Sequence, residues 1–87
     1  MLISFPSEEN WDATTTCIVF PAIINDELVI CAISREALRD NFNGDELAAI
    51  ECFRANRPAI EAKIKVLASK GRYEADGSIF IKSNDGA

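Results

Sequence analysis

Residues 15–33, TTCIVFPAIINDELVICAI, most constrain what this chain can fold into. The segment is rich in β-branched residues, which favour strands, and its strong turn-formers are Asn25 and Asp26. It therefore predicts two antiparallel strands joined by a two-residue turn. Such a turn fixes the register and pairs Ile24 with Glu27. Continuing this register pairs Ala22 with Val29, Phe20 with Cys31, and Ile18 with Ile33.

Both faces of the predicted hairpin are apolar. One face would carry Ile18, Phe20, Ala22, Ile24, Val29, Cys31 and Ile33. The other would carry Cys17, Val19, Pro21, Ile23, Leu28, Ile30 and Ala32. We expect both faces to be covered, one by helices and the other either by a short helix and the segment around Trp11 or by a partner. Because Pro21 donates no ladder hydrogen bond, it predicts an edge position or a bulge.

Shorter elements flank the hairpin. Residues 2–5 predict a strand that Pro6 ends, and Ser7 can cap a helical turn whose dipole Glu8 and Glu9 would stabilise. Trp11 would close one end of the core. Residues 78–81 predict a last strand, which could form a hairpin with residues 72–74 across the turn at Asp76-Gly77.

Two helical regions follow the hairpin. Ser34 predicts the start of a short helix over residues 35–41, which Asn43-Gly44 would end. Asp45 would cap a longer helical run that continues to Lys70, where Gly71 stops it. A straight helix of this length would span about 39 Å, more than the roughly 31 Å diameter of a compact chain of this size. With Pro58 inside the run, we expect a kink or a break near Asn56-Arg57.

The chain is therefore predicted to be one α+β domain over residues 1–87, with residues 83–87 as a frayed tail. Its small antiparallel sheet would contain a short N-terminal strand, the central hairpin and a C-terminal strand. A short helix and a kinked or broken long helix would pack against this sheet. No apolar run is long enough to predict a membrane span, and the N-terminus does not look like a signal peptide. We expect a cytoplasmic protein.

Composition excludes much chemistry. The chain has no histidine, which removes the commonest general base and metal ligand. It also lacks C-x-x-C, P-loop and G-x-G-x-x-G motifs. Its three cysteines, Cys17, Cys31 and Cys52, lie in apolar patterns and are expected to be buried and free. We expect no enzymatic activity, no catalytic residue, no cofactor and no metal.

Charge is unevenly distributed along the chain. The net charge of −5 divides into −8 up to Phe53 and +3 from Arg54 onward. Arg54 and Arg57 are the most informative polar pair, because Arg57 falls within the apolar stripe of the helix. It could form a salt bridge with Glu61, four residues on, or bind a ligand or partner. Arg54, Arg57, Glu61 and Trp11 are therefore the candidate partner-binding residues.

Several short segments, in this order, give the chain a family resemblance. They are Phe5-Pro6, residues 9–12 (ENWD), 19–22 (VFPA), 29–34 (VICAIS), 36–38 (EAL), 53–57 (FRANR), 60–61 (IE) and Asp76-Gly77. The chain thereby resembles the small bacterial proteins of domain-of-unknown-function family 1488, although Pro58 is less typical of them. The resemblance implies a compact α+β domain with an antiparallel sheet and C-terminal helices. It implies no activity, and no site residue can be transferred.

Two functions remain as hypotheses. The first is an interaction module, either a homodimer or a small adaptor, because a leftover apolar face would be a large exposed patch. The second is a nucleic-acid-associated regulator that uses the basic C-terminal helix, with Arg54, Arg57, Lys63, Lys65 and Lys70 as its positive charges. The net negative charge makes nucleic acid the less favoured partner.

Overall fold

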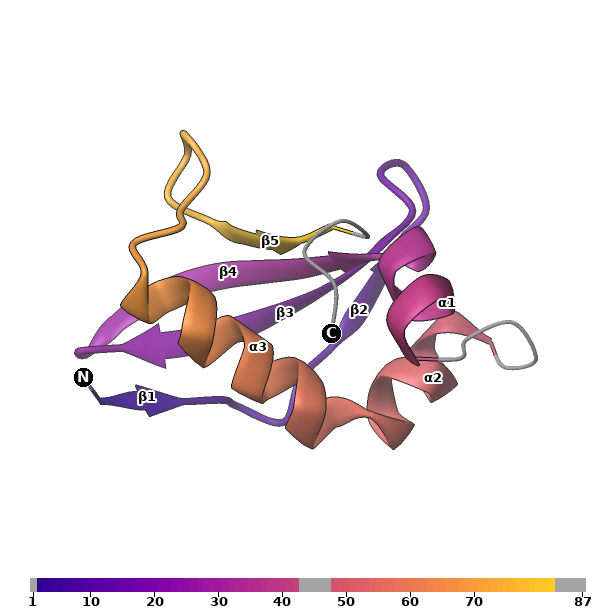
Figure 1. The fold of residues 1–87 in the computed structure, drawn as a ribbon, viewed down its shortest axis with the longest axis horizontal. Helices are drawn as coiled ribbons and strands as arrows, with labels where there is room; N and C mark the ends of the chain where they lie inside the picture. Colours follow the sequence, from indigo (N-terminus) through magenta and orange to yellow (C-terminus); the bar gives the residue numbers. More distant parts are fainter. Residues whose placement is uncertain (1, 43–47, 83–87) are drawn as a thin grey trace.

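The computed structural model describes residues 2–42 and 48–82 (Figure 1). One sheet is formed by β1 (Ile3–Ser4), β2 (Asn10–Asp12), β3 (Cys17–Ile24), β4 (Glu27–Ser34) and β5 (Ile79–Ile81). The helices of these ranges are α1 (Arg35–Phe42), α2 (Ala49–Ala55) and α3 (Arg57–Ser69). The fold is α+β, as predicted.

The central hairpin has the register that its turn predicts. Ile24 pairs with Glu27, and the pairing continues without a shift to Cys17 opposite Ser34. Asn25 and Asp26 have φ angles of 50° and 68°. Positive φ at both turn residues defines a primed turn, whose twist matches that of the strands it joins.

Pro21 lies where β3 has no strand neighbour on one side. β1 and β2 both pair with the same edge of β3, one at each end, and leave the middle of that edge free. Odd-numbered backbone groups of β3 face this edge, because the same side of the chain continues to Asn25, whose N–H donates to the carbonyl of Leu2. Continuing the β1 register would put Pro6 opposite Pro21. Neither has an N–H, so the ladder stops there and the chain leaves the sheet before β2 begins.

β5 corrects the prediction of a purely antiparallel sheet. It pairs with β4 in parallel, with Ile79 opposite Cys31 and Ile81 opposite Ile33. The helices between the two strands supply the crossover that parallel pairing requires. The predicted strand at residues 72–74 is also wrong. Those residues form a loop, which is closed by a 2.7 Å hydrogen bond from the N–H of Glu74 to the carbonyl of Ser78.

The long helical run is broken and not merely kinked. α2 ends at Ala55 and α3 begins at Arg57, with Pro58 in its first turn. Asn56 occupies the break, and its side-chain amide donates to the carbonyls of Cys52 at 2.9 Å and Phe42 at 3.4 Å. The predicted end of α1 at Asn43-Gly44, the predicted cap at Asp45 and the tail at residues 83–87 lie outside the described residues.

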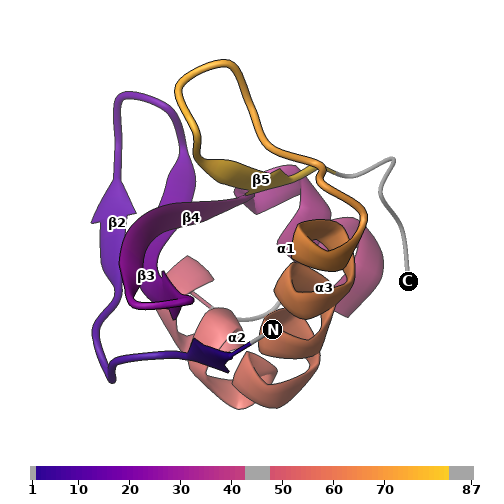
Figure 2. The ribbon, with the colours of Figure 1, turned by 90° about the vertical axis from the view of Figure 1, so that its left-hand side faces the viewer.

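The helices lie on one side of a curved sheet (Figure 2). This concave side of the sheet forms the core with them. Its largest fully buried side chains include Ile18, Phe20, Ile33, Leu38, Phe53, Ile60, Ile64, Ile79 and Ile81. The rings of Phe20 and Phe53 meet at 4.9 Å between centroids and join the sheet to α2.

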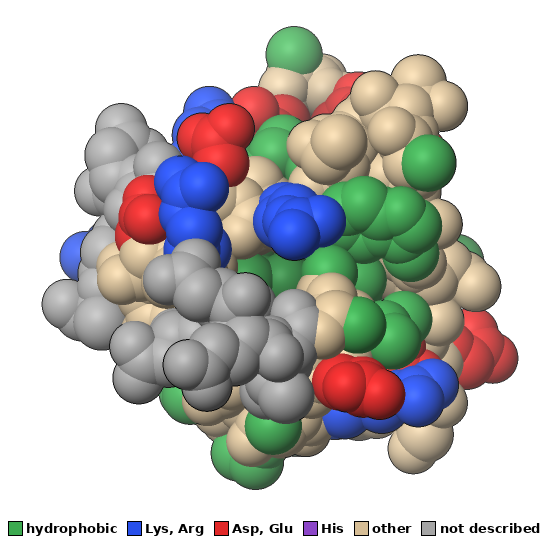
Figure 3. Space-filling view, turned by 90° about the vertical axis from the view of Figure 1, so that its right-hand side faces the viewer, with side chains coloured by type: hydrophobic (Ala, Val, Ile, Leu, Met, Phe, Trp, Pro, Cys, Tyr) green, Lys and Arg blue, Asp and Glu red, His purple; other side chains and the backbone are tan. Residues whose placement is uncertain are grey.

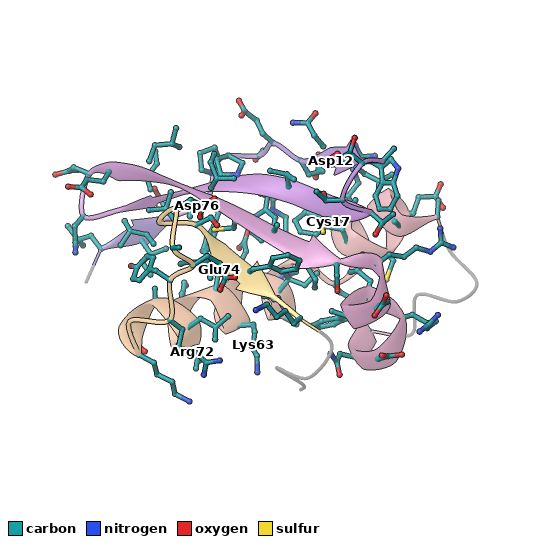
Figure 4. All side chains as sticks on the ribbon, turned by 90° about the horizontal axis from the view of Figure 1, so that it is seen from above. Asp12, Cys17, Lys63, Arg72, Glu74 and Asp76 are labelled. Atoms are coloured by element: carbon teal, nitrogen blue, oxygen red, sulfur yellow. The ribbon has the colours of Figure 1, made fainter. Side chains whose placement is uncertain are left out.

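The opposite, convex side is not covered as expected. In the part of the chain that the structure describes, neither the short helix α1 nor the Trp11 segment lies over it (Figures 2 and 4). Trp11 pairs with Ile18 in β2, which places it on the concave side. Within residues 2–42 and 48–82, the expected shelter is therefore found on the concave side of the hairpin alone.

Candidate interaction surface

Arg57 is held on all sides by neighbouring groups. Its guanidinium donates from Nε to Glu61 at 2.8 Å, from Nη1 to Glu9 at 3.1 Å, and from Nη2 to the carbonyl of Pro6 at 2.7 Å. Its Cζ also lies 5.2 Å from the centre of the Phe53 ring. This geometry ties the segment between β1 and β2 to the start of α3. Since its guanidinium nitrogens are all engaged, Arg57 is better placed to stabilise the fold than to bind a ligand.

Glu9 is the partner that sequence reasoning missed. The predicted helical turn at Ser7 does not form, so Glu9 does not stabilise a helix dipole there. Its carboxylate instead faces Arg57 and also lies 3.5 Å from Arg54. The five N–H donors of Arg57 require more acceptors than Glu61 offers. The donors left over by Glu61 indicated that Arg57 needs a second acceptor group, but they did not identify which carboxylate it is.

The remaining predicted site residues are not brought together as one site. Arg54 is exposed, and its ion pair is with Glu9, the carboxylate that also pairs with Arg57. Trp11 is exposed beside the core, on a strand that contacts α2, and does not close the core as expected. Lys63 and Arg72 lie on the helical side of the molecule and point away from the sheet (Figure 4).

The convex side of the sheet carries apolar strand side chains that the helices do not cover. Alternation along β3, β4 and β5 places Val19, Pro21, Ile23, Leu28, Ile30, Ala32 and Phe80 there. Leu28 and Ile30 are 67% and 47% exposed, and the others are half-buried by their neighbours. Soluble monomers rarely leave a contiguous apolar patch of this kind uncovered. We call this set of seven residues the convex face.

Polar groups border the convex face. Asn25, Asp26 and Glu27 form the hairpin tip at one end, and Asp12 lies beside Cys17 at the other (Figure 4). At the end of the molecule that bears α1 and α2, further apolar side chains are exposed beside a basic group (Figure 3). An apolar centre with a polar rim is the usual anatomy of a protein–protein interface.

The cysteines are buried and unpaired. Cys17 and Cys31 lie on opposite faces of the hairpin, as predicted, and all three cysteines are free. Burial raises the pKa of Cys31 to about 12 and also raises the pKa of Cys52. A protonated thiol is a poor nucleophile. In the described ranges, no group of three or more Cys, Asp or Glu side chains is placed to hold a metal ion.

The structure thus defines a small α+β protein whose helices cover one face of a five-stranded mixed sheet. The chain belongs to the family described as "Protein of unknown function (DUF1488)", which it matches over residues 3–81. This confirms the resemblance inferred from the sequence. Among residues 2–42 and 48–82, no helix is long and apolar enough to cross a membrane.

The relatives of this chain are described as uncharacterized or of unknown function. It is 32% identical over 80 residues to the uncharacterized protein YrdB of Escherichia coli (strain K12), which covers 91% of this chain and 94% of that protein. YrdB of Shigella flexneri matches to the same extent. A crystal structure of a family member of unknown function from Shewanella loihica PV-4 has a TM-score of 0.82 at 22% identity. It covers 91% of this chain and 90% of that one.

Proposed function

We propose that this protein is an interaction module that self-associates through its convex face. The observation that carries the proposal is the exposure of Leu28 and Ile30 on an apolar sheet surface with no helix over it in the described ranges. The core of the chain is already closed on the concave side. The convex face is therefore not required to complete this core, and a partner can cover it without disturbing the fold.

A second copy is the partner that this face suits best. In a two-fold dimer each surface meets an identical one, which favours a face with apolar residues in the middle and like charges only at its rim. Two such sheets can stack face to face, as in a β-sandwich. The carboxylates of Asp26 and Glu27 lie at the hairpin tip, away from the middle of the contact.

The size of the face predicts a weak dimer. β3 and β4, with eight residues each, are about 27 Å long, and the three short strands add eight more residues. At about 4.8 Å of width per strand, each copy would offer about 400 Å². The total of about 800 Å² lies below the standard size of specific interfaces, in the range of weak, transient contacts. Burying a Leu or Ile fully contributes about 1.5–3 kcal/mol. Covering the exposed parts of Leu28 and Ile30 in both copies therefore contributes about 3–7 kcal/mol.

Sedimentation equilibrium from micromolar to millimolar protein tests the proposal. We expect wild type to dimerise reversibly and the double variant Leu28→Glu/Ile30→Glu to remain monomeric, with dimerisation weakened at least about 100-fold. Val66→Glu is the matched control, because Val66 is 44% exposed on α3, on the opposite side of the molecule. A wild type that stays monomeric throughout, or a dimer that Val66→Glu disrupts equally, would overturn the proposal.

The nucleic-acid alternative has less support. Two of the positive charges that it needs, Arg54 and Arg57, face the carboxylate of Glu9, and Arg57 also faces Glu61. Neutralised arginines contribute little to phosphate binding. We therefore do not propose this function.

A further inference from the structure

We propose that the open edge of β4, residues 27–30, binds an extended basic segment of a partner protein by strand addition. β5 pairs with β4 only at residues 31–33. The first half of β4 therefore has β3 on one side and, within the described residues, no strand on the other. This site is an edge of the sheet, so it does not depend on self-association through the convex face.

Backbone groups at this edge are free to pair. Ile24 and Glu27 close a two-residue hairpin loop, and such closing residues bond to each other across the strands. Strand alternation then turns the N–H and C=O of Leu28 and Ile30 away from β3. Pairing with β5, which places Cys31 opposite Ile79, uses the carbonyl of Ile30, so both groups of Leu28 and the N–H of Ile30 remain. Among the hydrogen bonds of the described residues, none joins the backbone of Leu28 to a group on that side. An exposed row of this kind is a template for an added strand.

A cavity follows the open edge. It has a volume of about 490 Å³ and lies between the hairpin tip and the loop that leads into β5. Its walls include Leu28 and Val29 on the strand side, and Tyr73, Asp76 and Gly77 on the loop side. This volume is in the range of ligand-binding pockets. The loop stands off from the strand, so a guest backbone can reach the edge and its side chains can enter the cavity.

Charge selects the occupant. The carboxylates of Glu27 and Asp76 border the cavity, and the Ser78 hydrogen bonds to Asp76 lower its pKa, which keeps it ionised. Tyr73 offers an exposed ring beside them, which can contact a cation. A second copy at this edge would bring two sets of like charges together. An extended segment with Lys or Arg at alternate positions would instead pair its backbone with β4 and its cations with these groups.

A designed peptide probe tests the inference. The probe is a capped peptide of alternating lysine and valine, and its controls are the same peptide with glutamate for lysine and one N-methylated on alternate residues. We expect the lysine peptide to bind, with amide NMR shifts concentrated at Leu28 and Ile30. Both control peptides should bind at least about 10-fold more weakly, since each loses charge pairing or edge hydrogen bonds.

Two protein variants separate the edge from the convex face. Leu28→Pro removes the edge N–H while leaving the β3–β4 ladder bonds intact, and Leu28→Ala keeps that N–H but removes the side chain. Peptide binding should weaken about 10-fold or more in the proline variant relative to the alanine variant. The alanine variant should lose self-association while keeping peptide binding.

The following results would overturn the inference: no binding of the lysine peptide, equal binding of the N-methylated or glutamate peptide, or equal binding by the two Leu28 variants. If Leu28→Pro does not fold, the N-methylated peptide gives the same information from the ligand side, because it requires no change in the protein.

Discussion

Replacing Arg57 with alanine should test whether the charged cluster stabilises the fold. The substitution removes three hydrogen bonds, two of them to carboxylates, and the packing of the guanidinium on Phe53. It also leaves Glu9, with a side chain only 14% exposed, facing Arg54 alone. Breaking a fully buried pair costs about 3–5 kcal/mol, whereas an exposed pair contributes about 0–1 kcal/mol. Because Arg57 is 18% exposed, we expect an intermediate loss of about 2–3 kcal/mol.

Urea unfolding followed by Trp11 fluorescence measures this loss, because Trp11 is the only tryptophan in the chain. The same loss should lower Tm by about 10–20 °C in a domain of this size. Arg54→Ala is the matched control: Arg54 contacts the same carboxylate but is 61% exposed, so its loss should cost less than about 1 kcal/mol. If Arg57→Ala and Arg54→Ala destabilise the protein equally, the structural role is refuted and the ligand-binding role of Arg57 regains support.

Two further predictions concern the end of α3 and the core. Gly71 follows α3 with a φ of 69°; its N–H donates to the carbonyl of Ala68, and the N–H of Arg72 donates to the carbonyl of Leu67. No atom crowds a Cβ added at Gly71. In urea unfolding, Gly71→Ala should therefore lower the free energy of unfolding only by the backbone strain, about 1–2 kcal/mol. Cys31 has a pKa raised from 9.0 to about 12, so its protonated thiol favours folding below pH 9 and this contribution is lost as the pH rises toward 12. The unfolding free energy should then fall with pH by up to about 1.4 kcal/mol per unit, less steeply in Cys31→Ala; equal slopes would contradict this.

The sequence predicted the hairpin best, because local chemistry determines it. Asn25 and Asp26 tolerate positive φ, and a two-residue turn leaves one register available. An interruption near Asn56-Arg57, either a kink or a break, was predictable for a similar reason, since Pro58 disrupts a helix and a straight one would not fit. Each of these predictions depends on residues that are neighbours along the chain.

Long-range pairing was harder to predict. A strand as short as β5 has no pattern that distinguishes parallel from antiparallel pairing, and its direction is decided by the path of the helices before it. Glu9 contacts Arg57 across 48 positions, and several other acidic residues could have done so. With both hairpin faces apolar, the alternation could not indicate which one the helices would cover.

The facing positions of Pro6 and Pro21 limit edge-to-edge aggregation. A long, uninterrupted edge strand can pair with strands of other molecules through its unpaired backbone groups, and fibrils grow by such pairing. Here that border is divided into β1 and β2, of two and three residues, and each is too short to seed such growth. At the opposite border the outermost strand, β5, is also only three residues long. Beside it, within the described residues, β4 has no strand neighbour over residues 27–30. Both borders of the apolar central hairpin are therefore short.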